Sequence, residues 1–226
     1  MTADIAERLT LALDESRRVS ALLQLPPSAK ACFVFAHGAG AGMDHPSMAA
    51  VATELAARSI ATLRFQFPYM ERRSRRPDPP PLCHATVRAA VAEAARLAPK
   101  LPLFAGGRSF GGRMTSQAQA IEPLAGVAGL AFLGFPLHPA GKPSAERAEH
   151  LREVKIPMLF LQGTRDELAT LELLEPVIDA LGTRASLKLL QDADHSFHVP
   201  ARTGRKDADV RAEMLDAMAT WIEQAI

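Results

Sequence analysis

The sequence predicts an α/β fold with a doubly wound, mostly parallel sheet, and three observations lead to that prediction. Short, almost continuously apolar runs alternate with longer amphipathic stretches from about residue 31 onward, which is typical of parallel strands covered on both faces. Repeated strand–helix alternation favours right-handed crossovers within one sheet. The opening segment differs, because two apolar runs flank Asp14-Glu15-Ser16 and predict an antiparallel hairpin at one edge.

The elements follow from these patterns. Strands are expected at residues 31–36, 60–65, 101–105, 127–133, 156–161 and 186–190, and the hairpin strands at 9–13 and 19–25. Helices are expected at residues 46–58, 85–97, 110–121, 145–154, 168–181 and 207–224. Residues 71–81 combine a run of arginines with four prolines, and proline at this density predicts a surface loop.

Bulk properties narrow the class of protein. The 226 residues, 48% apolar and 23% charged, predict one globular domain spanning residues 1–226. A net charge of +1 favours neither nucleic acid nor an anionic membrane as a partner. The two cysteines, Cys32 and Cys83, are too few for a disulfide framework or a structural zinc site. We find no signal-peptide pattern and no run long enough to span a membrane, so a cytoplasmic location is expected, with no metal and no cofactor.

A candidate nucleophile lies in Gly107-Arg108-Ser109-Phe110-Gly111, which matches G-x-S-x-G. A predicted strand precedes this motif and a predicted helix follows it, as the strained strand–turn–helix of a nucleophilic serine requires. Glycines on either side relieve crowding where backbone segments approach closely. The amide of Phe110 opens the helix, so we expect it to face a developing oxyanion. The competing interpretation is a tight glycine turn with an incidental serine.

A serine hydroxyl needs an imidazole to remove its proton, and the imidazole needs a carboxylate. Asp166 follows the strand predicted at 156–161, and His195 follows the strand predicted at 186–190. Both therefore belong to the same sheet edge as Ser109, in the chain order serine, acid, histidine. We predict Ser109, Asp166 and His195 as a catalytic triad.

Several residues close to the predicted acid and base compete for their roles. Glu167 is adjacent to Asp166 and takes its place only if the loop shifts. Asp192 and Asp194 are expected to shape the turn before His195 by side-chain-to-backbone hydrogen bonds. His198 suggests a metal pair with His195, but zinc needs a third ligand and the sequence supplies no suitable cluster. A packing or capping role is therefore expected for His198.

The glycine-rich stretch 37–42 (HGAGAG) follows the first predicted parallel strand. Such a turn supplies the second oxyanion donor, and we expect that donor to be the amide of Ala39. A dinucleotide fingerprint is excluded, because Met43 and His45 occupy the positions where its last glycine would stand. His37 is expected to hold the loop by hydrogen bonds, with contact to substrate as the alternative.

The motifs resemble those of the α/β-hydrolase superfamily, and more narrowly its small dienelactone-hydrolase-like branch, whose eukaryotic relatives include a subunit of the non-specific-lethal chromatin complex. The matching segments are 37–40 (HGAG), 43–46 (MDHP), 64–70 (RFQFPYM), 106–113 (GGRSFGGR), 134–139 (GFPLHP), 162–166 (QGTRD) and 194–197 (DHSF). The resemblance implies the α/β-hydrolase fold and the same triad and oxyanion loop. Dienelactone hydrolases carry a cysteine nucleophile where this chain has Ser109, which argues against a dienelactone substrate. The chromatin-subunit relatives indicate that the fold also serves as a scaffold.

The substrate side is predicted to be open. Only the 22 residues 134–155 separate the strands predicted at 127–133 and 156–161. This fold usually inserts its cap domain at that point, and 22 residues are too few for one. The site should therefore be open, which favours small or extended substrates. Candidate substrate contacts are His37, Gly38, Tyr69, Met70 and Arg108. Core packing is the alternative for the tyrosine and the methionine, and a structural ion pair is the alternative for the arginine. The arginines at positions 72, 73, 75 and 76 either clamp an anion or are solvated.

These features predict hydrolysis of a small ester or related acyl substrate through an acyl-enzyme. Two different functions stay open at this point: a non-catalytic binding module with the same fold, and acyl transfer or thioester chemistry with the same triad. The sequence makes no prediction about oligomeric state.

Overall fold

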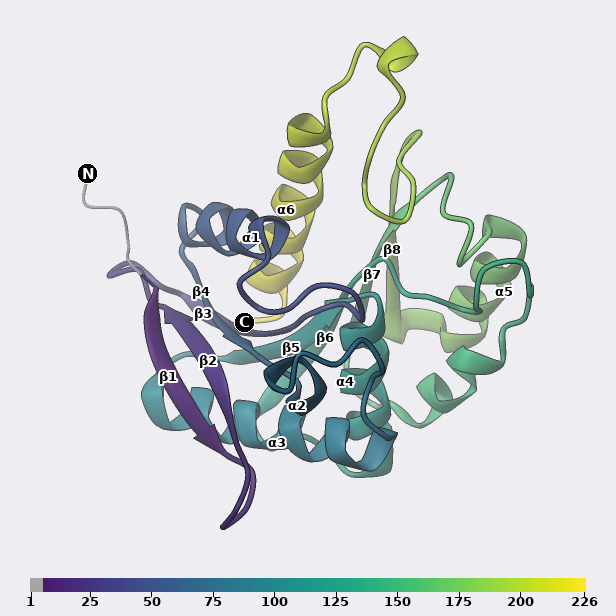
Figure 1. Ribbon diagram of the computed structural model, residues 1–226. Helices are drawn as coiled ribbons and strands as arrows, with labels where there is room; N and C mark the ends of the chain where they lie inside the picture. Colours follow the sequence, from purple (N-terminus) through teal and green to yellow (C-terminus); the bar gives the residue numbers. More distant parts are fainter. Residues whose placement is uncertain (1–5) are drawn as a thin grey trace.

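A computed structural model describes residues 6–226 and confirms the predicted α/β architecture. Eight strands form one sheet in the order β1-β2-β4-β3-β5-β6-β7-β8 (Figure 1). Strands β3 to β8 are parallel, whereas the β1–β2 hairpin pairs antiparallel with β4 at one edge. The first five residues of the predicted 1–226 domain lie outside the described part of the chain.

Three of the predicted strands, at residues 31–36, 60–65 and 127–133, have the expected bounds. The strands are β1 (Glu7–Ala12), β2 (Arg18–Gln24), β3 (Ala31–Ala36), β4 (Ile60–Phe65), β5 (Leu103–Arg108), β6 (Val127–Leu133), β7 (Met158–Gly163) and β8 (Ala185–Leu190). β5, expected at 101–105, continues through the glycines, because Gly106 and Gly107 pair with β3 and with β6. Glycine leaves a buried strand's hydrogen bonds intact, so its presence does not mark the strand end.

Helices cover both faces of the sheet. α1 (Pro46–Ala56) and α6 (Asp207–Gln224) lie on one face, whereas α3 (Pro80–Leu97), α4 (Phe110–Ile121) and α5 (Leu171–Leu181) lie on the other (Figure 1). Shorter elements are α2 (Pro68–Glu71), η1 (Glu146–Glu153), η2 (Gly182–Arg184) and η3 (Ala201–Thr203). Only residues 134–157 connect β6 to β7, and within the described residues no separate cap is inserted there.

Two sequence expectations need correction. The surface loop expected at 71–81 ends early, since Pro80 and Pro81 form the first turn of α3, where the missing proline N–H would have no partner in any case. The α-helix expected at 145–154 is the 3₁₀ segment η1. Its two buried side chains, Ala148 and Leu151, are three residues apart, and that spacing lines up on one face of a 3₁₀ helix.

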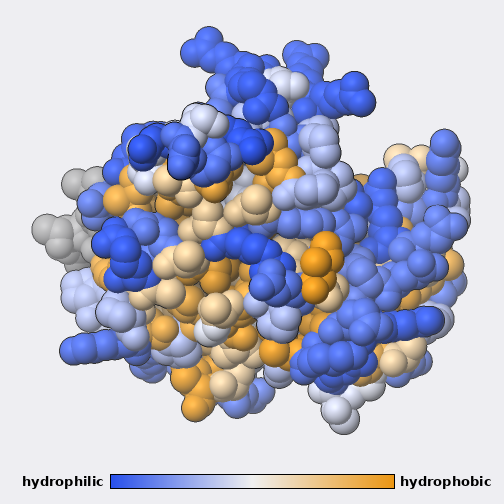
Figure 2. All heavy atoms as spheres, turned by 90° about the horizontal axis from the view of Figure 1, so that it is seen from below, coloured by the Kyte–Doolittle hydropathy of each residue, from blue (hydrophilic) through white to orange (hydrophobic). Residues whose placement is uncertain are grey.

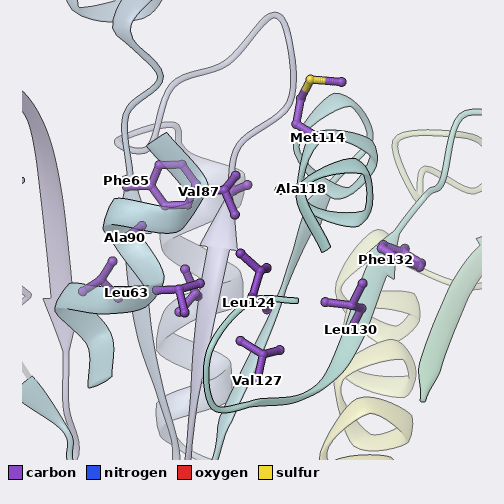
Figure 3. Packing of buried hydrophobic residues seen from close by; sticks show 14 of the residues in the cluster. Leu63, Phe65, Val87, Ala90, Met114, Ala118, Leu124, Val127, Leu130 and Phe132 are labelled. Carbon is purple, nitrogen blue, oxygen red and sulfur yellow. The ribbon is translucent and has the colours of Figure 1, made fainter. Parts of the chain in front are cut away.

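The sheet separates two hydrophobic cores. Figure 3 shows the larger one, in which side chains of the strands interlock with α3 and α4; its members include Leu63, Phe65, Val87, Ala90, Met114, Ala118 and Phe132. The second core joins Phe33 and Phe35 to α1 and α6. Each fully buried Phe or Leu contributes about 1.5–3 kcal/mol to stability. The face seen in Figure 2 mixes hydrophilic and apolar surface, and the large hydrophobic residues that are exposed are scattered.

The turn between β5 and α4 packs directly on the end of β3. A Cβ at Gly107 would lie 2.4 Å from the carbonyl oxygen of Ala36, and a Cβ at Gly111 would lie 2.5 Å from that of His37. Both obstacles are backbone atoms, which cannot rotate away. The two outer glycines of G-x-S-x-G are therefore required by the packing of β5, α4 and β3.

Buried polar groups hold the loop that follows β3. The fully buried His37 ring accepts a hydrogen bond from Phe67 N–H at Nε2 (3.0 Å), and its Nδ1 lies 2.7 Å from the carbonyl oxygen of Gly38. A carbonyl only accepts, so Nδ1 carries the proton and the ring is neutral. Burial lowers the pKa of His37 to about 4. The hydroxyl of Tyr69, also fully buried, donates to the carbonyl of Ala39 at 2.9 Å.

We predict that Gly111→Ala lowers the free energy of unfolding by about 1–3 kcal/mol, because the added methyl group meets backbone that cannot yield. Urea denaturation measures this change. Gly40→Ala is the matched control in the neighbouring loop, since a Cβ there meets nothing within 4 Å, and its effect should stay within about 0.5 kcal/mol. Equal stability of the two variants would contradict this account of the packing.

We predict that the free energy of unfolding falls as the pH decreases from about 6.5 towards 4. In that window the unfolded chain binds a proton at position 37 that buried His37, with its pKa of about 4, does not. The expected slope from this residue is about 1.4 kcal/mol per pH unit, and His37→Gln should remove it. Urea denaturation at several pH values provides the measurement.

His198→Gln gives a comparison with a pKa shift of opposite sign. Asp207 raises the pKa of His198 by a hydrogen bond, so the stabilisation from this side chain is complete below about pH 6.5 and fades as the pH rises above that value. His198→Gln should therefore lower stability throughout the range from about pH 6.5 to 4 without changing the slope there. A slope unchanged by His37→Gln would show that other groups govern the acid sensitivity.

Candidate active site

Ser109 occupies the sharp turn between β5 and α4. Its backbone angles are φ 49° and ψ −115°, and its N–H donates to the carbonyl of Leu133 at 3.1 Å. Positive φ is costly for a residue with a Cβ, and here the turn is held by the neighbouring strand β6. The strained turn leaves the Ser109 side chain half-exposed at the carboxyl edge of the sheet.

The structure brings the three predicted residues together. His195 Nε2 lies 2.8 Å from Ser109 Oγ, and His195 Nδ1 lies 2.7 Å from Asp166 Oδ2. The carboxylate of Asp166 is completely buried, whereas the His195 side chain is 24% exposed. Because a carboxylate only accepts, Nδ1 carries the proton and Nε2 presents its lone pair to the serine hydroxyl. This tautomer suits removal of a proton from Ser109.

Further hydrogen bonds orient the carboxylate. Asp166 Oδ1 accepts from the N–H of Leu168 at 2.8 Å, and Oδ2 accepts from the side-chain amide of Gln162 as well as from His195. The oxygen of that Gln162 amide accepts from Phe135 N–H at 3.0 Å. Fully buried Gln162 therefore ties Asp166 to the segment after β6. Sequence reasoning missed this role, although a glutamine near the end of an apolar strand is the signal that marks it.

The loop that carries His195 fits against the ends of β6 and β7. A Cβ at Gly163 would lie 2.3 Å from the carbonyl oxygen of Ala193, and one at Gly134 (φ +72°) would lie 3.4 Å from the His195 ring. Asp194 Oδ1 accepts from the N–H groups of Ser196 (2.7 Å) and His198 (3.0 Å). Asp194 thus shapes the turn by side-chain-to-backbone bonds, as the sequence suggested.

Glu167 and His198 take no part in this hydrogen-bonded group. Glu167 is exposed, and its carboxylate makes no hydrogen bond to the imidazole of His195 in the described chain. The exposed ring of His198 pairs with Asp207 at 3.0 Å. Within residues 6–226 no three acidic, cysteine or histidine side chains gather as a metal site.

Ala39 and Phe110, the predicted oxyanion donors, line the same cavity as Ser109. Phe110 is the first residue of α4, so its amide belongs to the helix end that carries partial positive charge. Ala39 belongs to the loop that His37 and Tyr69 hold from behind. Among the described residues neither amide is engaged in a backbone hydrogen bond, which leaves both for an incoming oxygen.

The cavity beside Ser109 has a volume of about 530 Å³. Its walls come from the loop after β3, the segment that leads into α3, the start of α4, the segment after β6, η1 and the segment after β7. The lining residues are Ala39, Pro77, Asp78, Pro80, Ser109, Phe110, Arg113, Met114, Pro136, His138, Pro139, Ala140, Arg147 and Leu168. Arg113 and Arg147 were not singled out from the sequence. The position of Arg113, one helical turn after Ser109, is a signal that could have identified it.

None of the five residues expected to contact substrate lines this cavity. His37, Gly38 and Tyr69 are buried behind the loop, and Met70 packs against the larger core. Arg108 faces the opposite side of the turn, where its guanidinium donates to Ser47 Oγ (3.1 Å) and to the carbonyl of Ser196 (3.4 Å). Their proximity in sequence to the motifs did not reveal which way each side chain faces.

The arginines of the loop after α2 are exposed. Arg72 pairs with the buried carboxylate of Asp78, so this arginine has a structural role, whereas Arg73, Arg75 and Arg76 extend into solvent. No helix in the described part of the chain is long and apolar enough to cross a membrane.

Solved structures with the same architecture come from several bacteria. The chain superimposes on dienelactone hydrolase from Anabaena variabilis with a TM-score of 0.78 at 21% identity, covering 97% of both chains. An α/β serine hydrolase without lid from Xanthomonas campestris gives 0.73 at 21% identity, covering 96% of this chain and 95% of the other. A serine hydrolase homologue from Coxiella burnetii gives 0.73 at 17% identity, covering 93% and 96%. At these identities the likeness establishes the fold.

The sequence itself carries the family assignment. Residues 29–223, nearly the whole chain, match the family model described as alpha/beta hydrolase domain. With the sheet order, the serine at the β5–α4 turn and the histidine after β8 in place, the protein belongs to the α/β-hydrolase family.

Proposed function

We propose that this protein is a serine hydrolase that cleaves a small ester through an acyl-enzyme. One observation carries the proposal: a continuous hydrogen-bonded path from Ser109 Oγ through the His195 ring to the buried Asp166 carboxylate, with distances of 2.8 and 2.7 Å. Such a path needs no cofactor to activate the hydroxyl.

The geometry suggests the following steps. His195 Nε2 takes the Ser109 proton as Oγ attacks the ester carbonyl, and the amides of Ala39 and Phe110 bind the oxyanion. Collapse of the tetrahedral intermediate breaks the bond to the alcohol, which receives the proton from His195. Water then attacks the acyl-enzyme with His195 again as base, and release of the acid restores Ser109. Asp166 holds the imidazole and stabilises its charged form throughout.

The uncapped cavity supports small or extended substrates. Dienelactone hydrolase is a structural neighbour, but the serine nucleophile of this chain favours an ester other than a dienelactone. Acyl transfer with the same residues is distinguished from hydrolysis by analysing products with and without an added alcohol or thiol. The chromatin-subunit resemblance, the small-molecule partner, the single domain and the cytoplasmic location stay predictions.

We predict that Ser109→Ala lowers kcat for a 4-nitrophenyl ester by about 10⁶-fold and Asp166→Asn by about 10⁴-fold. The first change removes the nucleophile, and the second leaves the imidazole in the wrong tautomer. Steady-state hydrolysis assays on purified protein measure both values. Ester hydrolysis retained by Ser109→Ala would refute the assignment.

Labelling with a fluorophosphonate separates an enzyme from a binding module with the same fold. The intact protein should become labelled at Ser109, as mapped by peptide mass spectrometry, and Ser109→Ala should not. Ser116→Ala is the control, because Ser116 lies on the same helix and contacts His150 away from the Ser109–His195 pair. An unlabelled wild-type protein would favour the scaffold.

A further inference from the structure

The cavity beside Ser109 carries positive charge that no carboxylate among residues 6–226 neutralises. Arg113 and Arg147 both line it, and both are half-buried. Within residues 6–226 neither guanidinium forms an ion pair with a carboxylate. Burial lowers the pKa of Arg113, and the nearby charge of Arg147 lowers it further. Two like charges held together at a partly dry surface indicate that the missing partner is an anion.

The acidic residue in the same cavity is already engaged. Asp78 accepts a hydrogen bond from the N–H of Tyr69 at 2.6 Å and pairs with Arg72. Its carboxylate is 3% exposed, and it is occupied by these two partners rather than by Arg113 or Arg147. The Arg113 guanidinium contacts the Phe110 ring, with 5.8 Å between Cζ and the ring centroid, but its Nε is buried without a hydrogen-bond acceptor in the described chain.

A third cavity residue has an unused acceptor. His138 is 1% exposed, and its Nδ1 lies 2.9 Å from the carbonyl oxygen of Pro139, so Nδ1 carries the proton. The other ring nitrogen, Nε2, is buried and has no partner among residues 6–226. In this tautomer Nε2 presents a lone pair, and a buried lone pair is satisfied by an O–H or N–H group.

We propose that this cavity is a subsite for an acidic acyl group, whose carboxylate is bound by Arg113 and Arg147 and whose hydroxyl group donates to His138. The proposal rests on the proposed function, because it places the ester carbonyl at Ser109. Arg113 follows Ser109 by four residues on α4, a rise of about 6 Å, so the carboxylate lies a few bonds from the scissile carbonyl. A monoester of a short hydroxy-dicarboxylic acid has this chemistry.

The charge requirement is tested with two esters of equal chain length, 4-nitrophenyl hexanoate and the 4-nitrophenyl monoester of adipic acid. Wild-type protein should have the larger kcat/KM for the adipate monoester at low ionic strength. Arg113→Gln and Arg147→Gln should each lower the ratio of the two kcat/KM values by about 10- to 100-fold, the loss expected for a hydrogen bond to a charged group.

Arg75→Gln is the matched control, because Arg75 is exposed on the loop after α2 and its loss should leave the ratio at the wild-type value. Circular dichroism and fluorophosphonate labelling verify that each variant is folded. Equal or better turnover of the hexanoate ester by the wild type would overturn the subsite. So would variants that slow both esters by the same factor.

Binding of the free acids tests the subsite independently of hydrolysis. By calorimetry, Ser109→Ala protein should bind adipate at least 10-fold more tightly than the neutral hexanamide, and 3-hydroxyadipate more tightly still. His138→Asn retains a donor for the carbonyl of Pro139 but lacks the Nε2 acceptor, so it should lose the preference for the hydroxyl. His138→Gln, whose amide oxygen reaches the Nε2 position, should keep it.

The two sets of results separate the proposals. Adipate binding without ester turnover would leave the subsite standing while the hydrolase assignment fails. Ester turnover without any preference for adipate over hexanoate would remove the subsite and leave the hydrolase. A hydroxyl preference that survives His138→Asn would remove His138 from the subsite.

Discussion

The hydrogen bond between the His195 ring and the buried Asp166 carboxylate is the interaction on which the rest of the site depends. A buried carboxylate is tolerated only when its lone pairs are occupied, and Asp166 receives the N–H of Leu168, the amide of Gln162 and the imidazole. The bond between Gln162 and Phe135 N–H then links the acid loop to the segment after β6. Orienting one imidazole thus requires buried polar groups from two strand ends.

The nucleophile side meets a different constraint, which is close approach of backbone. β5 and α4 can place Ser109 within reach of the imidazole only because Gly107 and Gly111 allow the turn to rest on the end of β3. The same contact positions the loop after β3, which His37 and Tyr69 fix from behind. Packing therefore couples the nucleophile to the candidate oxyanion donors, and a change in either segment displaces the other.

Sequence patterns predicted the sheet well because a parallel strand that is buried on both faces consists almost entirely of apolar residues. β3, β4, β6, α4 and α6 have the expected bounds, and the chain order of Ser109, Asp166 and His195 carried the candidate triad. The sequence did not reveal in which direction the side chains around the site point. Arg108 and Arg113 flank the same serine, but the first ends a strand and turns toward Ser47, whereas the second lies one helical turn on and reaches the cavity. Gln162 was missed because its two partners come from segments that only the fold brings together.

The absence of an inserted cap between β6 and β7 in the described chain changes how selectivity can arise. An enclosed apolar pocket selects by shape, but an open cavity leaves most of a small substrate in contact with water, where apolar contacts discriminate weakly. Charged groups whose partner is missing discriminate more strongly, since a ligand without the complementary group leaves them desolvated and unpaired. Arg113 and Arg147 are charged groups without a carboxylate partner among residues 6–226, and the neutral ring of His138 adds Nε2, a buried acceptor that has no donor there. Arg108 differs from these residues, because its guanidinium already donates hydrogen bonds to Ser47 Oγ and to the carbonyl of Ser196. We therefore propose that the α4 and η1 side of Ser109 governs selectivity in this chain.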